Sequence, residues 1–222
     1  MTAQERWTVA VGEQTTSALV DHSEGDGQVI ALGHGASTNM EHRSMESRAA
    51  ALVAAGLTVV RFNFLYTEQK RSPPERMPRL LECFRAVVAE ARERLAPRTL
   101  LLGGHSMGGR AASHLAAEGD PCDGLLLLSY PLYPTGQPEK LRSEHLPAIR
   151  VPVLSLSGTR DEMCDRERME AVLAPLHAEW TMHWLEGADH GFHVQKRSGR
   201  TDEEVMTEVT AVTREWLSRF GP

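Results

Sequence analysis

Six short apolar segments alternate with segments of helical pattern along this chain of 222 residues. Within each segment the apolar residues follow one another without a regular polar alternation, which is typical of strands covered on both faces. Strands that alternate with helices favour a parallel sheet joined by right-handed crossovers. The sequence therefore predicts an α/β fold of three layers, with helices on both faces of a mostly parallel sheet. The predicted strands are residues 28–34, 57–64, 99–104, 124–131, 151–158 and 179–186.

Four segments have helical patterns. Residues 77–95 place apolar side chains at spacings of three and four, with Glu and Arg on the opposite face. Further helices are predicted at 44–55 and 106–118, and the last helix begins with a capping box at 201–204, Thr-Asp-Glu-Glu. The segment WTVAV at 7–11 is expected to add an antiparallel strand at the edge of the sheet.

Composition limits the size of the fold and its partners. A mass of 24.5 kDa with 41% hydrophobic residues suits one well-buried domain over residues 1–222. A net charge of -6 without a basic stripe argues against nucleic acid as a partner. No apolar segment approaches the roughly 18 residues that span a bilayer, and the amino terminus lacks the pattern of a signal peptide. We therefore expect a cytoplasmic protein that acts without a membrane.

The segment TLLLGGHSMGGR (99–110) contains the pattern G-x-S-x-G, with Ser106 between Gly104 and Gly108. Where a buried strand turns sharply into a helix, glycines at these positions let strand and helix approach closely. The serine then lies at the tip of the turn, with its hydroxyl exposed. The pattern predicts a nucleophile elbow, but a glycine-rich turn that happens to contain a serine would match it equally well.

Residues that follow other predicted strands complete a catalytic set. Functional groups gather at the carboxyl ends of parallel strands. Asp161 follows the segment 151–158, and His190 follows 179–186. The chain order Ser106, Asp161, His190 is that of the Ser-Asp-His triads on this type of sheet. Ala36, in the loop after the first predicted strand, and Met107 are expected to supply the backbone N–H groups of an oxyanion hole.

These motifs identify a resemblance. The segments GHGAS, GGHSMGGRAAS, GTRDEMC and GADHGF resemble the α/β-hydrolase superfamily over essentially the whole chain, and more narrowly its small KANL3/Tex30-like members, with dienelactone-hydrolase-like proteins as cousins. The resemblance implies a minimal α/β-hydrolase fold without a cap domain. The chain departs from the dienelactone hydrolases at the nucleophile, because they have cysteine where this chain has Ser106.

The residue types predict a metal-free serine hydrolase without a cofactor. Ser106 would attack a small acyl substrate, His190 would act as general base and later as general acid, and Asp161 would orient the imidazole. Carboxylic esters with short acyl chains are the expected substrates. The alternatives are a non-catalytic scaffold that binds other proteins, and the same triad acting as a thioesterase, peptidase or acyltransferase.

Several acidic residues compete with Asp161 for the third position of the triad. Asp165 opens the segment DRERMEAVL and is better explained as a helix N-cap. Glu162 would point away from Asp161 in an extended loop. Asp189 is adjacent to His190 and poorly placed to reach back to its ring.

Histidines, cysteines and one arginine near these motifs have simpler interpretations. His34, His105 and His193 could gather near the site, but no pair has the H-x-x-x-H spacing of metal ligands. We expect His34 to anchor the oxyanion loop and His105 to pack beside the elbow. Arg110 is expected to pair with an acidic neighbour, with a contact to a substrate carboxylate as the alternative. The three cysteines lack the spacing of a zinc or redox site and are expected to be reduced and mostly buried, these being Cys83, Cys122 and Cys164.

Access to the predicted site depends on the segment 132–150, LYPTGQPEKLRSEHLPAIR. Nineteen residues, many of them charged or proline, are too few for an independent lid. We therefore expect an open cleft walled by short loops. Its predicted substrate-binding side chains are Met40, Phe64, Tyr130, Tyr133, Met163 and Phe192.

Overall fold

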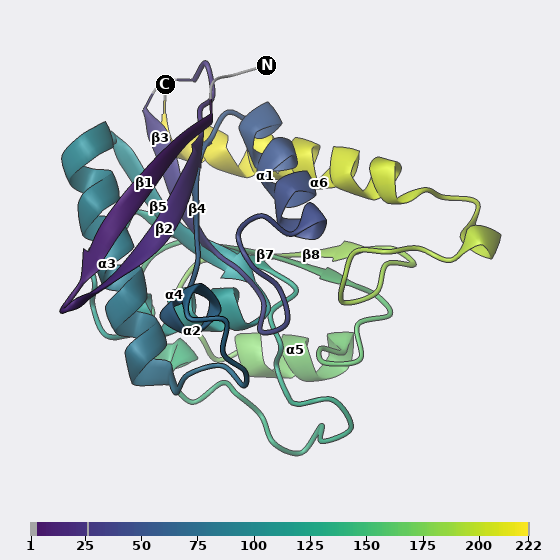
Figure 1. Cartoon of the computed structure of the whole chain (residues 1–222). Helices are drawn as coiled ribbons and strands as arrows, with labels where there is room; N and C mark the ends of the chain where they lie inside the picture. The colour runs from purple at the N-terminus through teal and green to yellow at the C-terminus, as the bar shows by residue number, and fades with distance from the viewer. Residues whose placement is uncertain (1–3, 26, 222) are drawn as a thin grey trace.

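A computed structural model describes residues 4–25 and 27–221 of the chain. Its centre is one sheet of eight strands in the order β1-β2-β4-β3-β5-β6-β7-β8 (Figure 1). The six strands from β4 to β8 in this order run parallel, and β1 and β2 add antiparallel pairs at one edge. The strands are β1 (Gln4–Val11), β2 (Gln14–Asp21), β3 (Gln28–Gly33), β4 (Thr58–Phe62), β5 (Thr99–His105), β6 (Gly124–Leu128), β7 (Val153–Gly158) and β8 (Trp180–Leu185).

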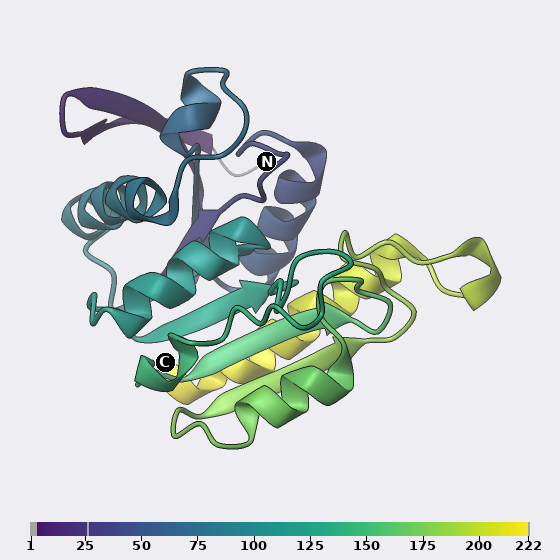
Figure 2. The ribbon, with the colours of Figure 1, turned by 90° about the horizontal axis from the view of Figure 1, so that it is seen from below.

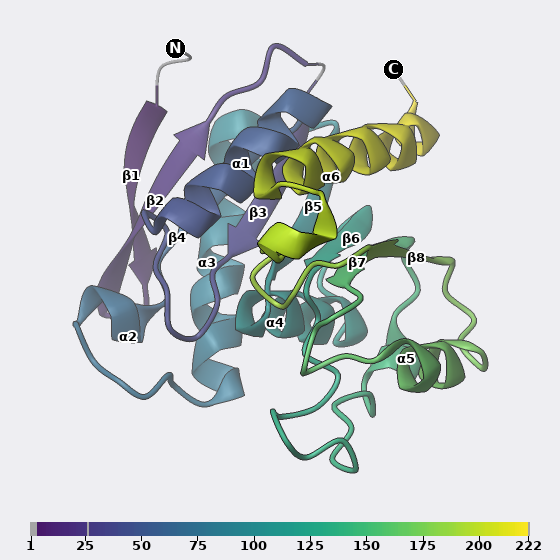
Figure 3. The same ribbon diagram turned by 90° about the vertical axis from the view of Figure 1, so that its right-hand side faces the viewer.

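Helices cover both faces of this sheet, which confirms the predicted three-layer α/β architecture. Helices α1 and α6 lie side by side on one face (Figure 3), and α3 and α4 pack together on the other (Figure 2). The predicted capping box opens α6, where Thr201 and Glu204 each bond the other's backbone N–H. The helices are α1 (Arg43–Ala55), α2 (Leu65–Glu68), α3 (Met77–Leu95), α4 (Met107–Ala117), α5 (Arg166–Leu173) and α6 (Asp202–Leu217).

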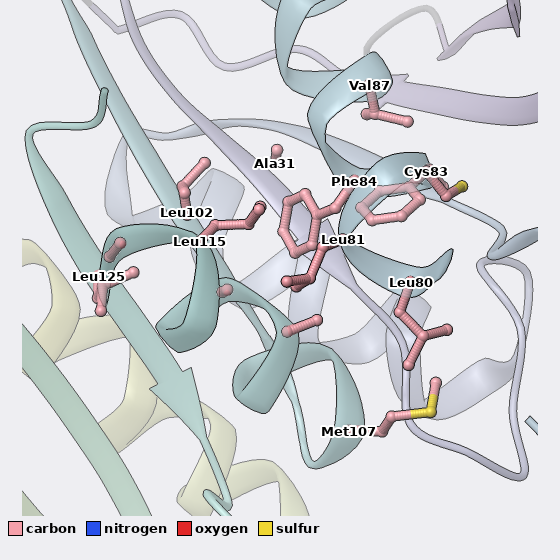
Figure 4. Close-up of a cluster of buried hydrophobic side chains, with 14 of the residues drawn as sticks. Ala31, Leu80, Leu81, Cys83, Phe84, Val87, Leu102, Met107, Leu115 and Leu125 are labelled. Carbon is pink, nitrogen blue, oxygen red and sulfur yellow. The ribbon is translucent and has the colours of Figure 1, made fainter. Parts of the chain in front are cut away.

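The hydrophobic core has two parts, because successive side chains of a strand point to opposite faces. In β5, Leu100 and Leu102 pack toward α3 and α4, whereas Leu101 packs toward α1 and α6. Figure 4 shows the first part, where Phe84 of α3 meets Leu102 and Leu115. All of these side chains are buried. The continuous apolar runs of the sequence therefore correspond to strands covered on both sides.

Strand β2 was missed by the sequence analysis. It pairs with both β1 and β4, so the predicted edge strand at 7–11 is real but joins the sheet only through β2. The first residues of β2, Gln14 and Thr15, are exposed, so its apolar residues make too short a run to be recognised. Gly12, with a φ of 59°, makes the tight turn between β1 and β2.

The connection between β6 and β7 is irregular. All of residues 129–152 are described, and their helical structure is a single 3-10 turn at Leu146–Ala148. The segment therefore lies on the body of the protein as a loop. Among the described helices, none is both long and apolar enough to cross a membrane.

Candidate active site

Ser106 lies between the end of β5 and the start of α4. Its φ of 52° and ψ of -113° are unusual for a residue other than glycine, and its backbone N–H donates to the carbonyl of Leu128 at 2.9 Å. A Cβ atom on Gly108 would lie 2.1 Å from the carbonyl oxygen of Gly33, and one on Gly104 would lie 2.5 Å from the carbonyl carbon of Gly108. Both glycines are therefore required by the close approach of α4 to the sheet, as the elbow pattern predicts.

The three residues predicted as a triad form one chain of hydrogen bonds. The Oγ atom of Ser106 lies 2.9 Å from Nε2 of His190, and Nδ1 of His190 lies 2.8 Å from Oδ2 of Asp161. The other carboxylate oxygen, Oδ1, accepts a hydrogen bond from the N–H of Met163 at 2.8 Å. The Asp161 side chain is fully buried, whereas 27% of the His190 side chain is exposed. This arrangement holds the ring of His190 by Nδ1 and leaves Nε2 facing the serine.

The loop that carries His190 rests directly on the end of β7. A Cβ atom on Gly158 would lie 2.1 Å from the carbonyl oxygen of Ala188, so only glycine allows this contact. Arg48 of α1 is buried and donates to the carbonyls of Ser44 at 2.8 Å and of Gly191 at 3.0 Å. Burial lowers the pKa of Arg48 to about 10, and the charge of Asp189 opposes that shift. Arg48 therefore remains charged at neutral pH and ties α1 to the histidine loop.

His105 supports the same loop from the elbow. Its ring is buried, and its Nε2–H donates to the backbone carbonyl of His190 at 3.0 Å. Burial places the pKa of His105 well below its ordinary value, so the ring is neutral. The sequence predicts only that His105 packs beside the elbow, and it gives no indication of a role for Arg48. His105 occupies a variable position of the G-x-S-x-G pattern and Arg48 lies in no motif, so no sequence signal indicated these contacts.

The loop after β3 is held as predicted by His34. Its Nδ1–H donates to the carbonyl of Gly35 at 2.7 Å, and its Nε2 accepts from the N–H of Phe64 at 3.2 Å. Burial lowers the pKa of His34 to about 4, so the ring is neutral and can take both roles. Tyr66 adds a hydrogen bond of 2.9 Å to the carbonyl of Ala36. The loop thus presents Ala36 beside Ser106 and Met107 in the wall of one cavity.

This cavity has a volume of about 460 Å³ and opens beside Ser106. Met107 and Leu80 line it and also belong to the core cluster shown in Figure 4. Met163 lines it as predicted. Its lining residues are Ala36, Pro74, Glu75, Arg76, Met77, Leu80, Ser106, Met107, Arg110, Pro131, Arg142 and Met163.

The other predicted pocket side chains require correction, because they are buried in the protein and do not line the cavity. The strands end earlier than predicted, at Phe62 and Leu128, and the side chains that follow turn back into the core. Phe64, for example, packs on Phe62 with 5.1 Å between ring centroids. The corrected residues are Met40, Phe64, Tyr130, Tyr133 and Phe192, all at most 5% exposed.

The other acidic residues considered for the third position of the triad make no side-chain hydrogen bond to His190. Asp165 is the N-cap of α5, where its side chain accepts from the N–H of Arg168 at 2.9 Å. Burial alone would raise the pKa of Asp165, but hydrogen bonds from Arg168 and Tyr133 lower it overall. Glu162 is exposed. Asp189 accepts from the backbone N–H groups of its own loop, those of Gly191 and His193.

The remaining titratable groups near the site do not converge on one point. His193 is exposed and pairs with Asp202 at 2.7 Å. Within residues 4–25 and 27–221, no three His, Cys, Asp or Glu side chains form a possible metal site. Burial raises the pKa of all three cysteine thiols, and Cys83 and Cys164 are buried while Cys122 is half-buried. The acidic partner expected for Arg110 is absent from the described residues, which corrects that prediction.

A family model described as an alpha/beta hydrolase domain matches residues 26–218. The chain belongs to this family of α/β hydrolases. Solved structures share the fold of this hydrolase. An α/β serine hydrolase without a lid from Xanthomonas campestris is 21% identical, with a TM-score of 0.76 over 100% of this chain and 97% of the other. A dienelactone hydrolase from Anabaena variabilis is 18% identical, with a TM-score of 0.77 over 98% and 97%. Est1E from Butyrivibrio proteoclasticus is 17% identical, with a TM-score of 0.75 over 97% and 98%.

Proposed function

We propose that this α/β hydrolase is a serine hydrolase that cleaves carboxylic esters through an acyl-enzyme. The observation that carries the proposal is the hydrogen-bond chain from Ser106 through His190 to Asp161. A serine hydroxyl is a poor nucleophile at neutral pH unless a base accepts its proton, and Nε2 of His190 lies at hydrogen-bond distance for that transfer. The exposed face of His190 also gives water access to the base.

The reaction follows from these roles. Ser106 Oγ attacks the ester carbonyl carbon while its proton passes to Nε2 of His190, and Asp161 stabilises the imidazolium that forms. The tetrahedral intermediate expels the alcohol, which takes the proton from His190. Water, deprotonated by His190, then attacks the acyl-enzyme and releases the carboxylic acid and the free serine.

The negative charge of the intermediate requires backbone donors, and Ala36 and Met107 are the proposed ones. Met107 is the first residue of α4, so its N–H has no acceptor within the helix and lies at the positive end of the helix dipole. Ala36 lines the same cavity as Met107 and Ser106. In comparable enzymes, each such donor contributes about 3 kcal/mol to stabilisation of the transition state.

Labelling by a fluorophosphonate tests this proposal. The reagent should phosphonylate Ser106 with loss of fluoride, because Ser106 alone combines a general base with the proposed oxyanion donors. Mass spectrometry of peptides locates the label, and Ser106→Ala is the control that should remain unlabelled. Folded protein that takes no label, or takes it on another serine, would favour the non-catalytic scaffold.

A panel of matched ester, thioester and amide substrates decides which acyl bond is preferred. Esters should give the highest kcat/KM. A faster thioester or amide would leave the triad in place but make the protein a thioesterase or a peptidase. Transfer of the acyl group to an added alcohol in preference to water would make it an acyltransferase.

A further inference from the structure

The cavity beside Ser106 contains more positive than negative charge. Three arginines line it, Arg76, Arg110 and Arg142, with Glu75 as an acidic residue in the same wall. Glu75 forms its ion pair with Arg71 outside this lining, at 3.6 Å, so the lining itself has three cationic side chains and one anionic one. The proposed hydrolysis of a neutral ester gives no reason for such a charge. An additional function of the cavity is therefore indicated.

Arg110 is placed by the helix of the nucleophile. It follows Ser106 by four residues in α4, and its backbone N–H donates to the carbonyl of Ser106 at 3.0 Å. Residues four apart on a helix share one face and are separated by about 6 Å along the axis. Arg110 is partly buried, and its Nε atom has no hydrogen-bond partner.

Arg142 reaches the same cavity from the loop between β6 and β7. Its backbone is held from both sides, since its N–H donates to the carbonyl of Leu132 at 2.7 Å and its carbonyl accepts from the hydroxyl of Tyr130 at 2.6 Å. Burial and the charge of Arg110 both lower the pKa of Arg142. Two arginines on separate elements thus line the same cavity.

Other groups around Arg110 do not offset this charge. His114 and His145 stack on one another with 3.6 Å between ring centroids, and Ser113 Oγ lies 2.7 Å from Nε2 of His145. Burial lowers the pKa of both rings, to about 3 for His145, and the charge of Arg110 contributes to both shifts. Both rings are therefore neutral at physiological pH.

Carboxylates that pair with other arginines are missing here. Arg85 of α3 contacts both Glu118 and Asp120, and the buried Arg61 contacts Asp21. In the part of the chain that the structure describes, none of the three cavity arginines forms an ion pair. Like charges that are partly desolvated repel one another, and this repulsion is relieved by a bound anion.

The position of His190 indicates which part of a substrate enters the cavity. His190 must protonate the leaving alcohol, yet it is not among the residues that line the cavity, whereas Ser106, Ala36 and Met107 are. The leaving group therefore lies toward His190, outside the cavity that the arginines line. The acyl part of the substrate extends from Ser106 along α4 toward Arg110 and Arg142.

We propose that this hydrolase acts on esters whose acyl part ends in a carboxylate, the half-esters of short dicarboxylic acids, and that Arg110 and Arg142 bind that carboxylate. The planar guanidinium groups suit it because each can donate two parallel N–H bonds to its oxygens. The proposal rests on the serine hydrolase function proposed above. It adds the substrate class and two specificity-determining residues.

A comparison of monoethyl glutarate with diethyl glutarate tests the proposal, with ethanol release followed by NMR. In the wild-type protein, kcat/KM for the half-ester should exceed that for the neutral diester about tenfold or more. Arg110→Met and Arg142→Met should each lower this ratio about tenfold or more, because each removes one cationic partner of the carboxylate. Arg197→Gln, an exposed arginine outside the cavity, is the matched control and should keep the ratio.

Binding to the Ser106→Ala variant separates this inference from the proposed function. Calorimetry should detect binding of monoethyl glutarate to Ser106→Ala, and loss of that binding when Arg110→Met is added. Near-ultraviolet circular dichroism of each variant verifies that it is folded, and Arg142→Met provides a second test on a different element.

Each result has one interpretation. A wild-type preference for the neutral diester that extends to the succinate and adipate pairs, or a ratio that the arginine substitutions leave unchanged, overturns the carboxylate site while the esterase function stands. Binding of the half-ester to Ser106→Ala without turnover of any ester by the wild type supports the arginine site and overturns the proposed hydrolysis.

Discussion

Ser106 begins α4 without capping it. A serine at this position normally accepts a hydrogen bond from a backbone N–H in the first turn. Here no such bond forms, and the hydroxyl lies 2.9 Å from His190 instead. The positive φ of 52° is costly for a serine and persists because the hydrogen bond to Leu128 and the packing of Gly108 against Gly33 leave no alternative. The strained turn holds the hydroxyl beside His190 at the wall of the cavity.

Substitutions at Asp161 and Asp165, which both follow β7, should distinguish a catalytic role from a role in stability. Asp161→Asn should lower kcat by about three to four orders of magnitude, because the amide cannot stabilise the imidazolium and favours the wrong tautomer of His190. Asp165→Asn is the matched control. Asparagine also caps helices well, so this variant should retain most activity and stability. Ester hydrolysis and thermal unfolding of both variants provide the measurements, and a reversed order of activities would assign the acid to Asp165.

The cap at Asp165 also predicts a pH dependence of stability. Its folded-state pKa is lowered, so the charged side chain stabilises the fold above its ordinary value near 3.8, and this contribution is lost as the pH falls through the folded-state value. At pH 7, Asp165→Ala should reduce the free energy of unfolding by about 1 kcal/mol. The difference should shrink below about pH 4. Urea unfolding of both proteins at several pH values measures it, and a constant difference would contradict the assignment.

The elements around the site depend on glycines at points of contact. Gly158→Ala should displace the loop of His190, because the added Cβ would collide with the carbonyl of Ala188 at the end of β7. A displacement of about 1 Å lowers the rate about a hundredfold. Gly136→Ala is the control, since nothing lies within 4 Å of its Cβ and only its φ of 72° opposes the change, at about 1–2 kcal/mol. The rate of fluorophosphonate labelling and the Tm of both variants distinguish the two effects.

The elements themselves were predicted well where the pattern was local. Helix α3 begins and ends at the predicted residues, and Gly56 follows α1 in the left-handed conformation, with a φ of 113°. Strand β2 was missed because its apolar run is short and its pairing with β1 and β4 is decided by residues distant in the sequence. The end of β6 was predicted at residue 131, three residues beyond its observed end at Leu128. This error put Tyr130 in the predicted pocket, whereas it lies in the core.

The molecule as a whole has no lid over its site between β6 and β7, where all of residues 129–152 are described and form a loop with one 3-10 turn. Among neutral p-nitrophenyl esters, acetate or butyrate should therefore be cleaved faster than palmitate. Each further methylene contributes about 0.8 kcal/mol only while it is removed from water, and no lid between β6 and β7 shields a long chain in the cavity from solvent.

Hydrolysis rates of a long-chain ester, measured below and above its critical micelle concentration, complete this test. No jump should occur, because no lid has to open at the interface. A preference for palmitate, or a jump in rate at the interface, would contradict the open, unlidded site described above.

The sequence by itself determined the order of the six parallel strands and of the main helices, the glycines of the elbow, the cap at Asp165 and the places of Ser106, Asp161 and His190 after their strands. These features depend on short-range sterics and on the rule that parallel strands end at one edge. Only the tertiary structure decided which side chains face the cavity. The chain leaves the strands at Phe62 and Leu128, earlier than predicted, and turns Phe64 and Tyr130 into the core, while Arg110 and Arg142 come to the same cavity from separate elements. The contact of Arg48 with Gly191 spans 143 residues, a distance across which no local pattern carries information.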